Sequence, residues 1–211
     1  WVWIKDRTTS EASHKVYDAV RGTTKYLAPN NTGAEATESG VTAFGSDGFT
    51  LGSAGGTNGN GISFVSWNWK AGTSFTNDAS STGVGSIDSA GSVSTDAGFS
   101  ICSYTGTGSN ATVKHGLSTA PKMIIFKNRN TSTDWDVYHG SLANTERLHL
   151  NTTGAKNTAA HAFNSTSPTT AVFSVGNADN TNKSSSPMIA YCFAEKQGYS
   201  KFGSYTGNGN A

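Results

Sequence analysis

The stretch Ile125-Phe126-Lys127-Asn128-Arg129 is a second version of Trp3-Ile4-Lys5-Asp6-Arg7, and this recurrence indicates how the chain is built. Further matches keep the same order along the chain. They are Val16-Tyr17 with Val137-Tyr138, Asn30–Ala34 with Asn151–Ala155, Ala43–Ser46 with Ala162–Ser165, Phe49–Gly52 with Phe173–Gly176, and Val65–Trp69 with Ile189–Phe193. The pairs that begin at Val16 and Asn30 share one offset of 121 residues, and all the pairs keep one order, which predicts a tandem duplication of one structural module.

A shorter repeat marks the place where a module begins. Gly98-Phe99-Ser100 and Ser103-Tyr104-Thr105-Gly106 recur as Gly198-Tyr199-Ser200 and Ser204-Tyr205-Thr206-Gly207. We therefore expect a first module over residues 1–97, which lacks a counterpart of 98–121 and carries a Ser- and Gly-rich insert over 70–97. A second module is expected over 98–211, with the start of a third repeat at 198–211. Because the repeats start at these places, we expect the chain to be one section of a longer array of modules.

Composition and patterning favour an all-β fold. The chain has 25 Gly and only 4 Pro, and its short aromatic and β-branched runs are bounded by Gly, Asn or Asp. In 64–69, for example, Val65, Trp67 and Trp69 share one face of an expected central strand. No long window keeps helical spacing. We expect tandem β-sandwich modules, lectin-like or jelly-roll-like, with little helix, and a small hairpin that turns at Ala90-Gly91.

Charge and hydropathy argue against several classes of partner. The formal net charge is +1 and 14% of the residues are charged, so no strong field favours nucleic acid. The apolar runs are too short for a membrane-spanning helix, and we expect no membrane insertion. The two cysteines, Cys102 and Cys192, are expected to pack as small apolar side chains rather than to form a disulfide.

One aromatic-carboxylate cluster suggests sugar contact. Asp134 and Asp136 flank Trp135, and Tyr138 follows. A glycosidase needs two carboxylates around its substrate. However, the equivalent stretch 13–17 has no carboxylate, and residues two apart on one strand do not enclose a substrate. We therefore expect no catalytic residue here; the cluster is either an exposed strand edge or a non-catalytic glycan contact.

Two cation pairs, Lys5 with Arg7 and Lys127 with Arg129, are kept in both copies. Cations at i and i+2 on one strand face can hold an acidic sugar or a carboxylate of a neighbouring chain. Alternatively, they protect a strand end against edge pairing, and we favour that structural interpretation. The five histidines show no metal-ligand spacing, and no glycine loop opens a helix, so neither a metal nor another cofactor is expected.

The order of the motifs in the second copy resembles a known kind of module. The motifs are Gly98–Ile101, Ser103–Gly106, His115-Gly116-Leu117, Ala120–Ile125 and Ala190–Glu195. They resemble an uncharacterised module that recurs, often in tandem, in predicted tail-fibre and other virion structural proteins of marine bacteriophages. The resemblance covers essentially the whole chain and carries no catalytic residues. It implies a place in a virion tail or surface appendage, contact with other virion proteins, and self-association, commonly as a homotrimer.

Together these observations predict a non-enzymatic virion appendage protein, a tail-fibre or receptor-binding segment that contacts host surface polysaccharide. Two alternatives remain. One is a purely structural virion or extracellular filament subunit that joins its neighbours by strand addition through Tyr199–Thr206. The other is a polysaccharide depolymerase that uses Asp134 and Asp136.

Overall fold

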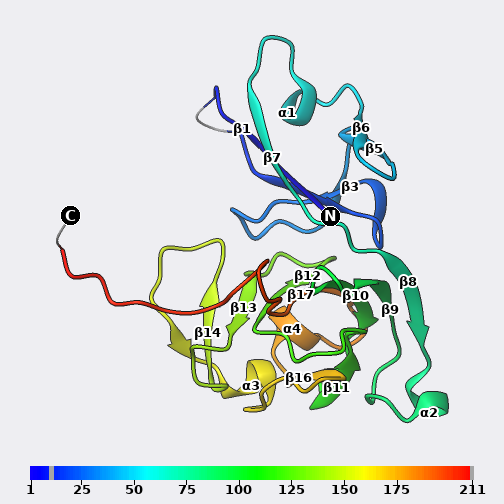
Figure 1. The fold of residues 1–211 in the computed structure, drawn as a ribbon, viewed down its shortest axis with the longest axis vertical. Coiled ribbons are helices and arrows are strands. Elements are labelled where there is room, and N and C mark those ends of the chain that lie inside the picture. The colour runs from blue at the N-terminus through cyan, green and yellow to red at the C-terminus, as the bar shows by residue number, and fades with distance from the viewer. Residues whose placement is uncertain (10–11, 210–211) are drawn as a thin grey trace.

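Two antiparallel sheets dominate the computed structural model, which describes residues 1–9 and 12–209. The smaller sheet has the strand order β4-β3-β2-β1-β7. Its strands β1, β3 and β7 are labelled in the upper half of Figure 1. Its strands are β1 (Val2–Asp6), β2 (Lys15–Asp18), β3 (Gly22–Leu27), β4 (Ala36–Thr37) and β7 (Phe64–Asn68).

The larger sheet has eight strands in the order β15-β14-β13-β12-β17-β10-β9-β8. They are β15 (Asn157–Thr158), β14 (Glu146–His149), β13 (Asp136–His139), β12 (Met123–Asn128), β17 (Pro187–Phe193), β10 (Phe99–Thr105), β9 (Ser89–Ser94) and β8 (Thr73–Asn77). Two separate ribbons pair β5 (Val41–Phe44) with β6 (Phe49–Leu51), and β11 (Ala111–Lys114) with β16 (Val172–Val175).

Helix is confined to four single turns in the described part of the chain. These are α1 (Gly55–Asn58), α2 (Ala79–Thr82), α3 (Ala160–Phe163) and α4 (Asp179–Asn182). The expected all-β class with little helix is therefore confirmed.

The sheet orders reproduce the duplication strand by strand. The order β4-β3-β2-β1-β7 of the first copy is matched by β15-β14-β13-β12-β17 of the second. The second sheet then continues through β10, whereas none of the residues that the structure describes pairs with the corresponding side of β7. As a result β7 is an edge strand, although its counterpart β17 is paired on both sides.

The insert over 70–97 is ordered but does not turn where expected. Ala90 and Gly91 lie inside β9, and the connection from β8 to β9 is the longer segment 78–88 with α2. Gly91 is required at this place, because a Cβ there would lie 2.1 Å from the Ile101 carbonyl oxygen. Both strands extend the second sheet through β10, although the sequence places the insert in the first module.

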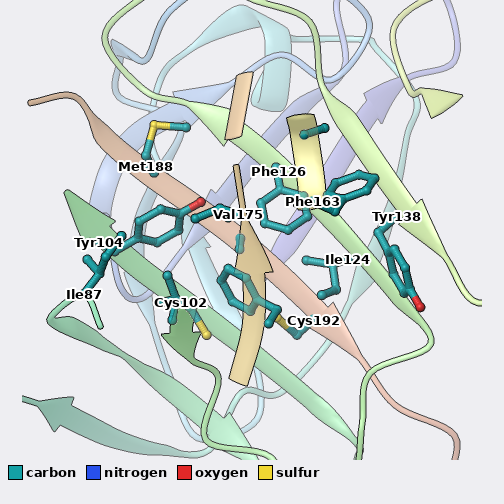
Figure 2. Close-up of a cluster of buried hydrophobic side chains, with 14 of the residues drawn as sticks. Ile87, Cys102, Tyr104, Ile124, Phe126, Tyr138, Phe163, Val175, Met188 and Cys192 are labelled. Carbon is teal, nitrogen blue, oxygen red and sulfur yellow. The ribbon is translucent and has the colours of Figure 1, made fainter. Parts of the chain in front are cut away.

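Hydrophobic side chains fill three layers. A central cluster lies between the two sheets and takes residues from both copies, including Trp1, Val16 and Leu27 from one and Ile125, Val137 and Tyr191 from the other. An outer cluster lies between the eight-stranded sheet and the layer of β16, α3 and α4 (Figure 2). A smaller cluster covers the outer face of the first sheet and includes Val2, Ile4, Tyr17 and Val41.

Equivalent faces of the two copies meet in the central layer. Val16 and its counterpart Val137 both belong to it, and the rings of Trp69 and its counterpart Phe193 lie 6.0 Å apart. Equivalent faces of the two modules are thus turned toward each other. Each copy has an outer layer of its own, but the central core is shared.

One matched segment adopts different structures in the two copies. Ala43-Phe44 belongs to strand β5, whereas the equivalent Ala162-Phe163 belongs to helix α3. The difference follows from β11, which pairs with β16 and comes from the segment that the first copy lacks. Without that partner, β6, the counterpart of β16, pairs with β5.

Candidate functional site

The proposed aromatic platform for a sugar is buried. Trp135 precedes β13 and is 1% exposed. Its indole N–H is shared between the carbonyl oxygens of Ala28 at 3.2 Å and Asn31 at 3.1 Å, so it joins the second copy to the first. Tyr138 is also buried and packs edge-on against Phe163. The predicted glycan contact through these two rings is wrong, because neither ring faces solvent.

The two neighbouring carboxylates are both occupied by protein groups. Asp136 is fully buried; it accepts hydrogen bonds from Arg147 at 2.7 Å and Asn180 at 2.8 Å. The predicted glycan contact by Asp136 is therefore also wrong. Asp134 is half-buried and accepts from Asn151 Nδ2 at 2.8 Å. Because Asp136 is buried and bonded to protein groups, the two carboxylates are not both open to a substrate, as a glycosidase would require.

Lys127 holds the first copy against the second. Its side chain is buried, and Nζ donates to the carbonyl oxygens of Thr32 at 3.0 Å, Thr133 at 2.8 Å and Thr131 at 3.3 Å. Burial lowers the pKa of this ammonium to about 8, although the negative charge of Asp134 acts to raise it. A cation this enclosed is a structural anchor, and the glycan contact predicted for it is wrong.

Arg129 continues the same connection two residues later. Its Nε and Nη2 each lie 2.9 Å from a carboxylate oxygen of Glu35, and Arg21 Nη1 lies 3.2 Å from the same group. Burial raises the pKa of Glu35, but the hydrogen bond and charge of Arg129, together with the charge of Arg21, outweigh it and hold this pKa below its usual value. Lys127, Arg129, Thr32 and Glu35 are called the inter-module clip below.

The first copy does not repeat the clip. Lys5 is half-buried and donates to the Asp6 carbonyl oxygen at 2.5 Å, and Arg7 is exposed. The residue equivalent to Glu35 is Lys156, which cannot pair with a cation. The expectation that these cations protect sheet edges is also wrong, because β1 and β12 are both interior strands.

A second polar contact between the sheets had no clear signal in the sequence. Asp18 and Arg21 are buried as an ion pair of 2.5 Å, and the Tyr191 hydroxyl donates to Asp18 at 2.7 Å. Burial raises the pKa of Asp18, but the Arg21 charge and the hydrogen bonds leave it lowered. The tyrosine lies far along the chain from its partners, so sequence spacing could not reveal this contact.

The structure contains a groove that sequence reasoning missed. It has a volume of about 480 Å³ and lies beside the end of β7. Its lining includes Phe44, Asp47, Phe49, Trp69 and Lys70. A mixture of aromatic rings with a few polar groups is typical of small-ligand sites. The lining comes from five separate parts of the chain, residues 1–2, 19, 44–49, 68–72 and 92, which explains why no local motif marked the groove.

Other chemistry is sparse in the described residues. Among residues 1–9 and 12–209, no three His, Cys, Asp or Glu side chains gather as a metal site, and no helix there has the length and apolarity to cross a membrane. Cys102 and Cys192 are buried free thiols, and burial raises the pKa of Cys192.

Comparison with known proteins gave one family. No curated protein matched the chain, and no solved structure matched it. The lectin-like or jelly-roll-like subclass therefore stays a prediction. The family match extends over residues 1–211, and the chain belongs to the family described as Domain of unknown function (DUF7483).

Proposed function

We propose that this chain is a non-enzymatic structural subunit of a virion appendage such as a tail fibre. The observation that carries the structural role is the shared central layer, in which equivalent faces of two module copies pack against each other. A module with this property builds larger bodies by association with copies of itself. The virion location rests on the resemblance in the motif order.

The use of the candidate ligand residues supports this role. Lys127 binds the Thr32 carbonyl oxygen of the other module, and Arg129 binds the Glu35 carboxylate there. The Trp135 indole N–H donates to the carbonyl oxygens of Ala28 and Asn31 of that module. These side chains hold the two modules together. Asp136 is neutralised by Arg147, which disfavours the depolymerase alternative.

Immunogold electron microscopy tests the location. Antibodies raised against the 211-residue chain should label an appendage on particles from cells that produce it. Label only on soluble material from the same cells would contradict the proposal. The homotrimer implied by the resemblance should appear as a mass of three chains in light scattering of the purified protein.

A receptor-binding role is the second candidate, and the groove beside β7 favours it. Host-surface glycans bind proteins through aromatic stacking and hydrogen bonds to charged groups, and Trp69, Asp47 and Lys70 offer both. Asp47→Ala and Lys70→Ala should each weaken binding on a glycan array about tenfold. Asp96→Ala, an exposed change outside the groove, is the matched control. Equal loss in all three variants would contradict the assignment.

A further inference from the structure

Strand β7 presents an unfilled hydrogen-bonding edge within the described residues. Trp69 N donates to Trp1 O at 3.0 Å, and Arg7 N donates to Ser63 O at 2.8 Å. The main-chain N–H and C=O groups of the odd-numbered residues in this segment therefore point toward β1. Alternate residues of an antiparallel strand bond to opposite sides. The remaining N–H and C=O groups point to the side where the sheet ends. Those groups belong to Phe64, Ser66 and Asn68.

The second copy shows what fills the equivalent edge. There β10 pairs with β17, with Cys102 opposite Ala190 and Tyr104 opposite Met188. Tyr104 is 5% exposed, its hydroxyl donates to the Thr181 carbonyl oxygen at 2.5 Å, and its ring packs edge-on against Phe173. Figure 2 shows this tyrosine in the outer cluster. The strand is therefore anchored by one large side chain as well as by its main chain.

One buried asparagine makes several of the hydrogen bonds that hold the loop after β10. Asn182 is fully buried; its Oδ1 accepts from Thr107 N at 2.8 Å, and its carbonyl oxygen accepts from Gly108 N at 2.8 Å. Its Nδ2 donates to the carbonyl oxygens of Ser109 and Gly176, each at 2.6 Å. The segment 106–109 thus closes over α4.

The first copy already has the receiving half of this arrangement. Asn58, the counterpart of Asn182, donates to the Gly52 carbonyl oxygen at 2.8 Å, as Asn182 does to Gly176. The turn after α1 repeats the turn after α4, with Ile62 N to Gly59 O at 3.2 Å against Ser186 N to Lys183 O at 3.1 Å. Asn58, however, is exposed, because no segment equivalent to 106–109 covers it.

The missing partner sequence occurs at the other end of the chain. Residues 203–209 read Gly-Ser-Tyr-Thr-Gly-Asn-Gly and repeat the Ser-Tyr-Thr-Gly-x-Gly pattern of 103–108. Gly209 and Gly108 even share a φ of 71°. The segment is exposed, Tyr205 is 95% exposed, and it belongs to no strand. It leads away from both sheets (Figure 1). Residues 210–211 of the expected third repeat lie outside the described residues.

We propose that residues 203–209 of one copy of this chain add as a strand to the β7 edge of a second copy. In the register of β10 and β17, Gly203 lies opposite Ser66 and Tyr205 opposite Phe64, and residues 207–209 close over Asn58. The inference deepens the proposed structural role by naming the joining segment and its acceptor. Because donor and acceptor surfaces differ, the contact is head-to-tail and can continue from chain to chain.

One glycine gives a selective test. A Cβ on Gly106 would lie 2.2 Å from the Lys183 carbonyl oxygen, so only glycine fits the closed loop. Gly207 takes this place in the proposed contact, yet in the single chain a Cβ on Gly207 meets nothing within 4 Å. Gly203 is equally open in the single chain, and its counterpart Cys102 carries a side chain in the paired strand. Gly207→Ala should therefore block pairing, whereas Gly203→Ala should not.

The measurement is sedimentation velocity of the 211-residue chain over a wide concentration range. The average mass of the unmodified chain and of Gly203→Ala should rise with concentration. Gly207→Ala should associate at least about tenfold more weakly. Ser66→Pro removes an outward-facing N–H on the acceptor edge and should have the same effect. A mixture of Gly207→Ala and Ser66→Pro should form one-to-one pairs, since the donor segment of Ser66→Pro can still join the β7 edge of Gly207→Ala.

Hydrogen exchange locates the contact. The amides of Phe64, Ser66 and Asn68 should become protected as concentration rises. Three results would overturn the proposal: a single-chain mass at every concentration, equal association of both glycine variants, or edge protection that does not depend on concentration, which would mean pairing within one chain. A single-chain mass would also remove the homotrimer, but none of these results bears on immunogold labelling, so the proposed virion location and this inference can fail separately.

Discussion

At the scale of single residues, the duplication provides matched pairs in which the same side chain has different surroundings. Lys127 is enclosed by three carbonyl oxygens, whereas its counterpart Lys5 is half-buried and bonds to one. The sequence showed that both were kept. It could not show which was buried, because that depends on the packing of the other module.

Lys127→Met should lower the free energy of unfolding by about 2–4 kcal/mol, because it leaves buried carbonyl oxygens without a donor. Lys5→Met should cost less than about 1 kcal/mol. Urea unfolding of both variants checks the difference. Equal losses would contradict the assignment of Lys127 to the inter-module clip.

His115 should make stability sensitive to mild acid. Its Nδ1 accepts from Leu117 N at 3.1 Å, its Nε2 lies 3.2 Å from the Thr169 carbonyl oxygen, and burial lowers its pKa to about 4. The folded state thus resists protonation. The free energy of unfolding therefore has its full value at pH values above the unfolded pKa of about 6.5, and it decreases as the pH is lowered from there. The expected loss between pH 7 and pH 5 is about 2 kcal/mol.

His115→Gln tests this origin, since glutamine does not titrate. The fall in unfolding midpoint between pH 7 and pH 5 should become much smaller in the variant. Burial and the charge of Lys5 also lower the pKa of His14. His14 therefore contributes in the same direction, and a small part of the pH dependence should remain in the variant. An unchanged pH dependence would show that another group is responsible.

At the scale of elements, backbone conformation follows neighbouring strands as well as local sequence. Strand positions were readable from alternation, as in Val65, Trp67 and Trp69. The pairing of β6 with β5 was not readable, because it reflects a missing β11 rather than any residue in either strand. The turn placed at Ala90-Gly91 failed for a similar reason, since close approach to β10 also requires glycine.

Strand β3 contains a residue under backbone strain. Thr24 has a φ of 66°, next to the irregular register between β2 and β3. A β-branched residue is unfavourable in this left-handed region. Thr24→Gly should therefore raise the free energy of unfolding by about 1 kcal/mol. Thr23→Gly, at a residue without positive φ, should lower it by about 0.5–1 kcal/mol, and the two midpoints in urea should move in opposite directions.

At the scale of the whole molecule, the sequence could reveal two modules but not how they face each other. A repeat shows that two segments share a structure, and it contains no information on which faces meet. The contacts that decide this, such as Tyr191 with Asp18 and Arg129 with Glu35, join residues far apart in sequence. The interpretation of the aromatic-carboxylate cluster as exposed failed because this packing was not foreseeable.

The shared central layer predicts one cooperative unfolding transition instead of two. Near-ultraviolet circular dichroism follows the tryptophans, four of which lie in the first copy, and hydrogen exchange follows β12 in the second. Both signals should change at the same urea concentration. Separate midpoints would mean that the modules are independently stable.

The unequal clip also has an evolutionary consequence. After a duplication, selection acts on each copy according to the contacts that copy makes, and Glu35 against its counterpart Lys156 shows that the copies have already diverged. Lys127 and Arg129 are fixed by their partners, while Arg7 is exposed and Lys5 makes one local bond. Across related chains, substitutions should accumulate at Lys5 and Arg7 while Lys127 and Arg129 are retained. The ancestral module would then be inferred more faithfully from the second copy than from the first.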